Sequence, residues 1–335
     1  MHKRQDGLWR EKVRINGKDK YFYGKTKAEL TRKVMEYKEI DKKGILFRDL
    51  AKQWWEDASE KLAHNTAKSY KPAMDRAVDR FGDRRVVNIL PTEISVHIRN
   101  FSKTHADKTV RTQLLVYRLI FAYGVEEGYV LTNPARDLKV PNNLPKRKVG
   151  MPSSEDIAKI KSGIDCTFGF FMYMALYTGM RRGELLALKW KDIDFKNNLI
   201  SVTKSVYNVN NVPYIKPPKT ENSLGTIPIL DALLPELKKR KGKGLVFPNA
   251  DGGLMSESNF KHYWYLYLKE SGVTATPHQC RHAYATMLFE AGIPPEEAQV
   301  LLRHAQISTT MDIYTDIRDT KQQAIYNKVK AIDIT

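Results

Sequence analysis

A tyrosine toward the end of the chain closes a distinctly polar segment. The segment runs from His304 to Tyr314 and carries serine, threonine and aspartate between these two residues. A core tyrosine normally has apolar neighbours, so this composition indicates a tyrosine presented for chemistry, with its hydroxyl free to act. The alternative is an ordinary core residue. A tyrosine hydroxyl, with a pKa of about 10, is a weak nucleophile unless other groups activate it.

Two further segments carry groups that suit such a reaction. In residues 178–184, Gly179 is expected to break one helix, which places Arg181 near the start of the next. Backbone N–H groups point outward at a helix start and favour an anion there. The alternative for the same residues is an ion pair between Arg181 and Glu184, three positions on. Lys219 lies at the tip of a predicted hairpin, where a lysine either serves the reaction or is simply solvated.

The segment 276–282 adds two more groups. Pro277 suits the first turn of a helix, on which His278 and Arg281 share one face because they are three residues apart. His278 and His282 have the spacing of two zinc ligands, but no glutamate lies between them and no third ligand is evident. We therefore predict no metal and no other cofactor.

These groups together match the needs of phosphoryl transfer to a tyrosine. If the hydroxyl attacks a phosphodiester, charge builds on the non-bridging oxygens, and arginine forks match that geometry. Each well-aimed donor in such a site is worth roughly 10²–10³ in rate. The leaving 5′-oxygen needs a proton, which a lysine on a mobile hairpin can supply. Cationic side chains do the work that metal ions do elsewhere, so the chemistry requires none.

The charge of the whole chain favours a polyanionic partner. Fifty-six Lys and Arg residues oppose thirty-eight Asp and Glu residues, a formal net charge of +18. This excess fits nucleic acid before membrane, because no basic amphipathic helix stands out. A basic protein without such a partner is the alternative. The longest apolar run, residues 166–178, is too short to span a bilayer, and the two cysteines and the absence of an apolar signal core predict a reduced, cytoplasmic protein.

The elements that must position these groups begin with a small basic part, residues 1–43. Residues 8–15 alternate as a strand does, and Asn16-Gly17 is a strong hairpin signal. Thr26 with Glu29 then makes a capping box for one helix. The part holds fourteen basic residues against seven acidic ones, which suits a DNA-binding three-stranded sheet with a helix. A solvated hairpin without a ligand is the alternative.

Residues 45–138 change to the periodicity of helices. Phe47 and Trp54 lie on one face of the first helix, and Asn65 is the expected cap of the second. Four such helices predict a compact all-α domain. Prolines, asparagines and basic residues fill 139–152 and leave little to bury, so an extended linker is expected there.

Residues 153–335 form the last predicted domain. Ser153 or Ser154 caps its first helix, with acids in the first turn. Residues 198–229 alternate as a short antiparallel sheet would, and residues 257–330 are helical again. The fold class is therefore multidomain α+β: a small sheet with one helix, an all-α domain, and a mainly α domain with a small antiparallel sheet.

The last domain resembles that of the tyrosine recombinases, the phage-integrase family. Its stretches "TGMRRGELLAL", "PKT…S…TIPI", "TPHQCRHAYATML" and "LLRHAQISTTMDIYTDI" match the motif boxes of that family in order and spacing. The whole chain is also similar to the three-part integrases of temperate phages and conjugative transposons. In those proteins a small N-terminal sheet domain binds arm-type sites, and a helical domain clamps the core site.

The resemblance implies a role for each matching residue. Tyr314 is the nucleophile that forms a 3′-phosphotyrosyl link, Arg181 and Arg281 bind the scissile phosphate, and Lys219 is the general acid. His278 assists proton transfer.

His304, by the same resemblance, hydrogen-bonds the phosphate. Glu184 supports Arg181, whereas Arg182 faces DNA or solvent. Tyr326, in a different context, is the rejected alternative nucleophile.

The chain departs from the family pattern at three places. Arg303 precedes His304 where the family often has glycine, and Cys280 stands where it often has leucine. Leu224-Gly225 replaces an arginine that the family's hairpin commonly carries. None of these changes removes a catalytic group, although the last bears on how the hairpin contacts DNA.

The function implied is a site-specific integrase that integrates and excises a mobile element at its attachment sites. Such an enzyme acts as a homotetramer on two duplexes in the cytoplasm of a bacterial host, with the tail after Tyr314 packed on a neighbouring subunit. A host DNA-bending factor and an excisionase are the expected accessory partners. One alternative is a catalytically silent DNA-binding regulator, against which the presence of all six catalytic groups weighs. The other is a type IB topoisomerase-like enzyme, against which the N-terminal basic sheet and the four-helix domain weigh.

Overall fold

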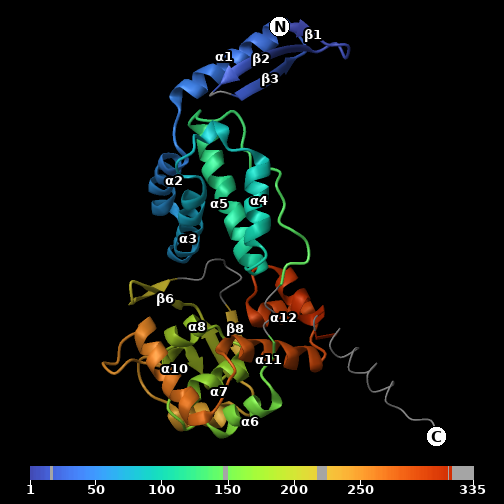
Figure 1. The fold of residues 1–335 in the computed structure, drawn as a ribbon. Coiled ribbons are helices and arrows are strands. Elements are labelled where there is room, and N and C mark those ends of the chain that lie inside the picture. The colour runs from blue at the N-terminus through green and yellow to red at the C-terminus, as the bar shows by residue number, and fades with distance from the viewer. Residues whose placement is uncertain (16–17, 146–149, 217–224, 316, 319–335) are drawn as a thin grey trace, which may run out of the picture. The chain divides into compact units, whose positions relative to one another are not determined.

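Figure 1 shows the computed structural model, which describes residues 1–15, 18–145, 150–216, 225–315 and 317–318. The chain divides into two compact units, Met1–Arg147 and Lys148–Thr335. Each unit is mainly helical and contains short antiparallel strands. The multidomain α+β class expected from the sequence is therefore confirmed. No helix in the described ranges combines the length and the apolar composition that crossing a bilayer requires.

The first unit begins with a three-stranded antiparallel sheet. Its order is β1-β2-β3, with β1 at His2–Lys3, β2 at Trp9–Ile15 and β3 at Lys18–Gly24. Helix α1 (Lys27–Lys43) follows, and the Glu29 backbone N–H donates to the Thr26 hydroxyl at 3.1 Å, as the predicted cap requires. The rings of Phe22 and Tyr37 meet edge to face at 5.1 Å and hold the helix on the sheet. The turn predicted at Asn16-Gly17 lies outside the described residues.

Four helices follow in the first unit, as the periodicity predicts. They are α2 (Phe47–Lys61), α3 (His64–Phe81), α4 (Pro91–Phe101) and α5 (Asp107–Glu126), with a 3-10 turn, η1, at Val86–Asn88. The expected cap at Asn65 is wrong, because α3 begins at His64 and Asn65 lies inside its first turn. The helices close on a shared apolar core in which Phe47, Tyr117 and Phe121 are fully buried.

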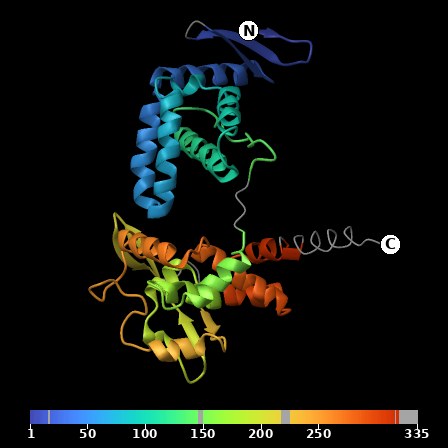
Figure 2. The ribbon, with the colours of Figure 1, turned by 60° about the horizontal axis from the view of Figure 1, so that its bottom comes forward.

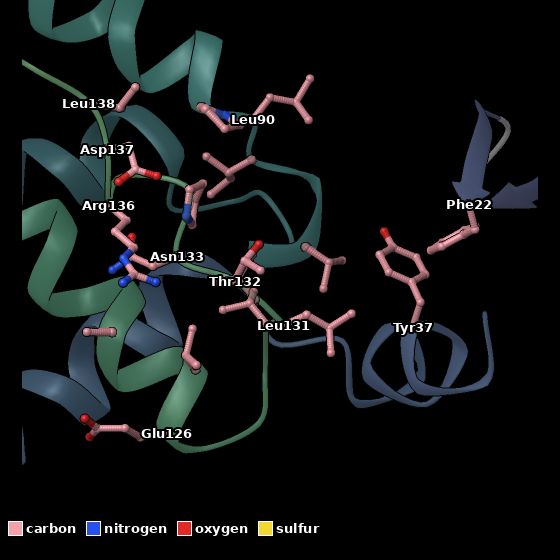
Figure 3. Close-up of a pocket in the computed structure, with 18 residues that line it drawn as sticks. Phe22, Tyr37, Leu90, Glu126, Leu131, Thr132, Asn133, Arg136, Asp137 and Leu138 are labelled. Carbon is pink, nitrogen blue, oxygen red and sulfur yellow. The ribbon is translucent and has the colours of Figure 1, made fainter. Parts of the chain in front are cut away.

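The first unit also holds a cavity of about 960 Å³. Figure 3 shows Phe22 and Tyr37 on one side of it, with Leu90, Leu131 and Asn133 on the other. Its lining includes none of the residues to which the sequence assigns catalysis. The catalytic candidates all belong to the second unit.

The second unit wraps its helices around short strands (Figure 2). Its helices are α6 (Ser154–Ser162), α7 (Gly169–Thr178), α8 (Arg182–Ala187), α9 (Leu234–Arg240), α10 (Glu257–Ser271), α11 (Pro277–Glu290) and α12 (Pro295–Leu302), with a 3-10 turn, η2, at Trp190–Asp192. Its strands are β4 (Ile193–Asp194), β5 (Leu199–Val202), β6 (Ser205–Val209), β7 (Val212–Lys216) and β8 (Gly225–Pro228). Residues 307–315 are also helical.

Two small sheets form the strand layer of this unit. One has the order β4-β5-β8, in which Ile200 pairs with Ile227 and both side chains are fully buried. The other is the β6–β7 hairpin. Helix α7 is buried on almost every side, as its apolar run predicts, and α11 packs against it. The predicted cap of α6 is confirmed, because the Ser153 hydroxyl accepts the Asp156 backbone N–H at 3.0 Å.

Candidate active site

The turn between α7 and α8 is built around Gly179. Its φ is +58°, and a Cβ there would come within 2.5 Å of the Tyr284 ring, so only glycine fits. Helix α7 therefore ends where the sequence predicts. Arg181 is the cap residue of α8, and its backbone N–H donates to the Glu184 carboxylate at 2.9 Å.

The Glu184 carboxylate receives two arginines. Arg181 Nη1 donates to Oε1 at 2.8 Å, which is the ion pair named above as an alternative. Arg303 Nη2 donates to Oε2 at 2.9 Å. Burial by itself would raise the pKa of the Glu184 carboxyl, but the charges of Arg303 and Arg181 outweigh it and lower that pKa. The Arg181 side chain remains 41% exposed, so the ion pair leaves it open to a ligand.

Arg281 is buried, at 4% exposure, on the second turn of α11. Its Nη1 donates to the Gly179 carbonyl at 2.6 Å, and its Nη2 donates to the Leu302 carbonyl. Arg281 thus joins the α7–α8 turn to the end of α12. Burial, with the charges of Arg181 and Arg303, lowers the pKa of Arg281 to about 9, so the guanidinium is protonated at neutral pH.

The guanidinium groups of the two predicted phosphate-binding arginines donate to the carbonyls of two consecutive residues. Arg181 Nη2 donates to the Arg303 carbonyl at 3.1 Å, and Arg281 donates to the carbonyl of the residue before it. His304 is the next residue along. Three of the predicted site residues therefore converge on the C-terminal end of α12, although 122 residues separate Arg181 from Arg303.

His304 is buried and is held by a residue that sequence reasoning missed. Its Nδ1 lies 2.8 Å from the hydroxyl of Thr310, which is itself fully buried. If Thr310 donates to Nδ1, the ring proton lies on Nε2, which is the tautomer that can donate to a phosphate oxygen. Burial, followed by the charges of Arg281 and Arg181, lowers the pKa of His304 to about 3. The imidazole is therefore neutral at physiological pH.

His278 lies at the exposed start of α11, where Pro277 is the first helical residue as predicted. Its ring meets that of His282 edge to face at 5.3 Å. Burial and the charges of Arg281 and Arg181 lower the pKa of His278, which favours the neutral form needed to accept a proton. In the described part of the chain, no group of three or more His, Cys, Asp or Glu side chains is placed to hold a metal ion.

Tyr314 is buried, and the expectation of a free hydroxyl is wrong in this structure. The phenol donates to the Ile293 carbonyl at 3.1 Å, and its ring meets Phe289 edge to face at 5.1 Å. Residues 307–315 form a helix, so Thr310 and Tyr314, four residues apart, share its buried face. The polar residues Ser308, Thr309 and Asp312 of the same helix are exposed. The polar composition is that of a solvated helix face, not of a presented tyrosine.

Leu224, Lys219 and Tyr326, all discussed from the sequence, lie outside the described residues. Lys219, the predicted general acid, falls between the end of β7 and the start of β8, and Tyr326 falls in the segment after Arg318. Sequence reasoning missed Thr310 and treated Arg303 only as a departure from the family pattern. The signal for Thr310 was its place one helical turn before Tyr314.

The second unit thus gathers buried arginines and a neutral histidine at one helix end, an arrangement that suits a protein handling phosphate groups. Residues 156–321 match the phage integrase family, and residues 47–140 match the phage integrase central domain. The chain belongs to the phage integrase family and is a site-specific tyrosine recombinase. The resemblance seen in the motif boxes is confirmed.

Relatives match along nearly the whole chain. A tyrosine recombinase XerC-like protein of Caldanaerobacter subterraneus is 30% identical, over 90% of this chain and 89% of its own length. The ICEBs1 integrase of Bacillus subtilis is 25% identical, over 90% of this chain and 87% of its own.

Solved structures share the fold. The Tn1549 transposon integrase, in complex with transposon right end DNA, has a TM-score of 0.69 at 21% identity, covering 84% of this chain and 100% of that one. A lambda integrase tetramer bound to a Holliday junction has a TM-score of 0.60 at 17% identity, covering 91% and 95%.

Proposed function

We propose that the enzyme integrates and excises a mobile element, with Tyr314 as the nucleophile that forms a 3′-phosphotyrosine. Arg181 and Arg281 bind the scissile phosphate, His304 donates to it, and Lys219 protonates the leaving 5′-oxygen. The observation that carries the proposal is the convergence of Arg181 and Arg281 on consecutive carbonyls directly before His304. A phosphodiester there would meet two guanidinium groups and a neutral imidazole in a partly buried site.

Attack requires Tyr314 to leave its place in the structure. Its hydroxyl is bound to Ile293, and burial raises its pKa, which makes the phenol a poorer nucleophile where it lies. We infer that the 307–315 helix moves when DNA is bound, so that the hydroxyl reaches the phosphate. His278, which is exposed at the start of α11, assists the proton transfer in this proposal.

The remaining parts serve DNA binding in this proposal. Residues 1–43 bind arm-type sites and residues 45–138 clamp the core site. Residues 139–152 link this helical domain to residues 153–335, which carry catalysis. In the first part, Arg10 lies over the Tyr21 ring at 5.1 Å and Lys27 over the Trp9 ring at 4.6 Å, so basic and aromatic groups alternate there.

The proposed assembly is a homotetramer on two duplexes, acting on DNA in the cytoplasm of a bacterial cell. The lambda integrase tetramer on a Holliday junction supports this assembly by analogy of fold. A host DNA-bending factor and an excisionase are proposed as accessory partners that set direction.

The test uses duplex DNA from the junctions of the element that encodes the chain, nicked close to the cleavage point to trap the intermediate. Wild type and Tyr314→Phe are incubated with it in the presence of EDTA, and a denaturing gel separates covalent adducts. We expect an adduct from wild type alone. Tight binding without an adduct from wild type would instead indicate a catalytically silent regulator. An adduct from the phenylalanine variant would mean that another tyrosine is the nucleophile. Relaxation of plasmid that lacks any junction sequence would indicate a topoisomerase.

A further inference from the structure

Arg303 has a backbone conformation and a degree of burial that are unfavourable for an arginine at the end of a helix. It ends α12 in the left-handed region, with φ +54°, where glycine is the favoured residue. Its side chain is 0% exposed. Its Nε is buried without a hydrogen-bond partner among the described residues. Strain, burial of a charge and an unsatisfied donor all oppose this placement, so some other contact must favour it.

The favourable contact is the Glu184 carboxylate. Arg303 Nη2 donates to Oε2 at 2.9 Å, on the oxygen that also accepts the Arg181 backbone N–H. Its Nη1 donates to the Leu301 carbonyl at 2.7 Å, which fixes the plane of the fork. Arg181 takes the other oxygen of the same carboxylate. Glu184 is thus clamped from two sides, and of the two arginines that hold it, Arg181 is 41% exposed and Arg303 is not exposed, so of this pair only Arg181 can meet a ligand.

The charges around Glu184 also favour an anionic ligand beside Arg181. Arg181, Arg281 and Arg303 carry three positive charges against one carboxylate, which leaves two uncompensated while His304 is neutral. The stem of Arg303 also packs on Gly225, the first residue of β8, where a Cβ would lie 3.3 Å from its Cγ. Arg303, which directly precedes His304, therefore also contacts the first residue of the strand that follows Lys219.

We propose that Arg303 is a positioning residue for strand cleavage: from the side away from DNA it holds Glu184, and through Glu184 it fixes the guanidinium of Arg181 that binds the scissile phosphate. This rests on the proposed function. Arg303 itself does not touch the phosphate, because its side chain has no exposed surface. The consequence is a specific pattern. Its loss lowers the rate of cleavage at saturating DNA and leaves DNA affinity almost unchanged.

The test compares three variants on the nicked junction duplex, with affinity measured by a mobility shift and cleavage by single-turnover adduct formation. Arg303→Met keeps the stem on Gly225 and removes the charge, Arg303→Gly removes the strain as well, and Arg303→Lys keeps the charge without the fork. We expect the methionine and glycine variants to cleave roughly 10- to 100-fold more slowly at saturating DNA, as for other residues that orient a ligand-binding group. Asn198→Gly, which relieves an exposed left-handed residue at φ +53° in the same unit, is the matched control and should cleave like wild type.

A double-mutant cycle with Glu184→Gln separates positioning from general loss of structure. If Arg303 acts through Glu184, Arg303→Met has almost no further effect in the Glu184→Gln background. If Arg303→Met slows cleavage by the same factor in the wild-type and Glu184→Gln backgrounds, the proposal is overturned. Cleavage at the wild-type rate by Arg303→Met, or a loss of DNA affinity alone, would also overturn it.

Arg303→Lys keeps the protein testable if the other variants fail to fold. It should cleave faster than Arg303→Met, and a lysine variant no faster than methionine would contradict the ion pair as the reason. Failure of wild type itself to form an adduct would count against the proposed function, not against the role of Arg303.

Discussion

The hydroxyl of Tyr314 donates to the backbone carbonyl of Ile293, 3.1 Å away in the loop between α11 and α12. The proposed nucleophile is therefore buried, with its ring against Phe289 and its hydroxyl held by a backbone carbonyl. If Tyr314 is the nucleophile, as proposed, strand cleavage requires its hydroxyl to leave this hydrogen bond. The sequence shows that the tyrosine is present, whereas the structure shows that its hydroxyl is not free to react.

Chemical modification should report the storage of Tyr314 directly. We expect tetranitromethane to nitrate Tyr265, which is 62% exposed, well before Tyr314, which is 6% exposed. The reagent needs the phenolate, and burial raises the pKa of Tyr314, which protects it further. Peptide mass spectrometry after short exposures of the DNA-free protein measures both sites. Nitration of Tyr314 at the rate of Tyr265 would contradict a stored tyrosine.

Thr310 should matter for cleavage as well as for stability. Thr310→Val keeps the shape and removes the hydroxyl that lies 2.8 Å from His304 Nδ1, so the imidazole loses its fixed tautomer. We expect adduct formation to slow by roughly tenfold and the free energy of unfolding to fall by about 1 kcal/mol. The matched control is Thr309→Val, because Thr309 is exposed on the same helix. Equal effects at the two positions would show that the hydroxyl of Thr310 has no special role.

The burial of His304 predicts how stability changes with pH. Burial, with the charges of Arg281 and Arg181, lowers the pKa of His304 to about 3 in the folded protein, against an ordinary value of 6.5. As the pH falls below 6.5 the unfolded chain takes up a proton that the folded protein does not. The contribution is therefore complete above pH 6.5 and is lost progressively as the pH falls toward 3.

By pH 5 the loss from this one group is about 2 kcal/mol. Urea unfolding at pH 7 and at pH 5 measures it, with His304→Gln as the comparison. We expect the glutamine variant to lose less stability than wild type between the two pH values, by about that amount. An identical loss in both proteins would show that other groups, such as His278, account for the pH dependence.

Gly179 should be difficult to replace. In Gly179→Ala the new Cβ would come within 2.5 Å of the Tyr284 ring, at a residue whose φ is +58°. We expect the free energy of unfolding to fall by roughly 2–4 kcal/mol. Gly252→Ala is the control, because Gly252 has φ +79° but nothing within 4 Å, and it should lose only about 1 kcal/mol. Denaturant unfolding of both variants measures the difference. A similar loss of unfolding free energy in the two variants would mean that the Tyr284 ring moves aside for the new Cβ.

The sequence by itself determined the local elements and the family. The glycine that ends α7, the Ser153 cap of α6 and the proline that opens α11 act on neighbours within one or two turns, so their effects can be read along the chain. The order and spacing of the motif boxes identified the family for the same reason. A boundary could still slip, as the cap expected at Asn65 shows, because tertiary packing decides the last residue of a helix.

The tertiary structure alone decided which groups meet and which are withheld. The pairing of Glu184 with Arg303 spans 119 residues, so no local sequence pattern predicts it. The local pattern predicts only the pair of Glu184 with Arg181, three residues away. Arg303, which the motif comparison marks only as a departure, is through this pairing a support for the proposed phosphate-binding Arg181. The polar run before Tyr314 predicted exposure, but a helix has two faces, and packing against α11 and the loop after it buried the one that carries the hydroxyl. Composition records which residues a segment contains, whereas only the folded chain sets the direction in which each one points.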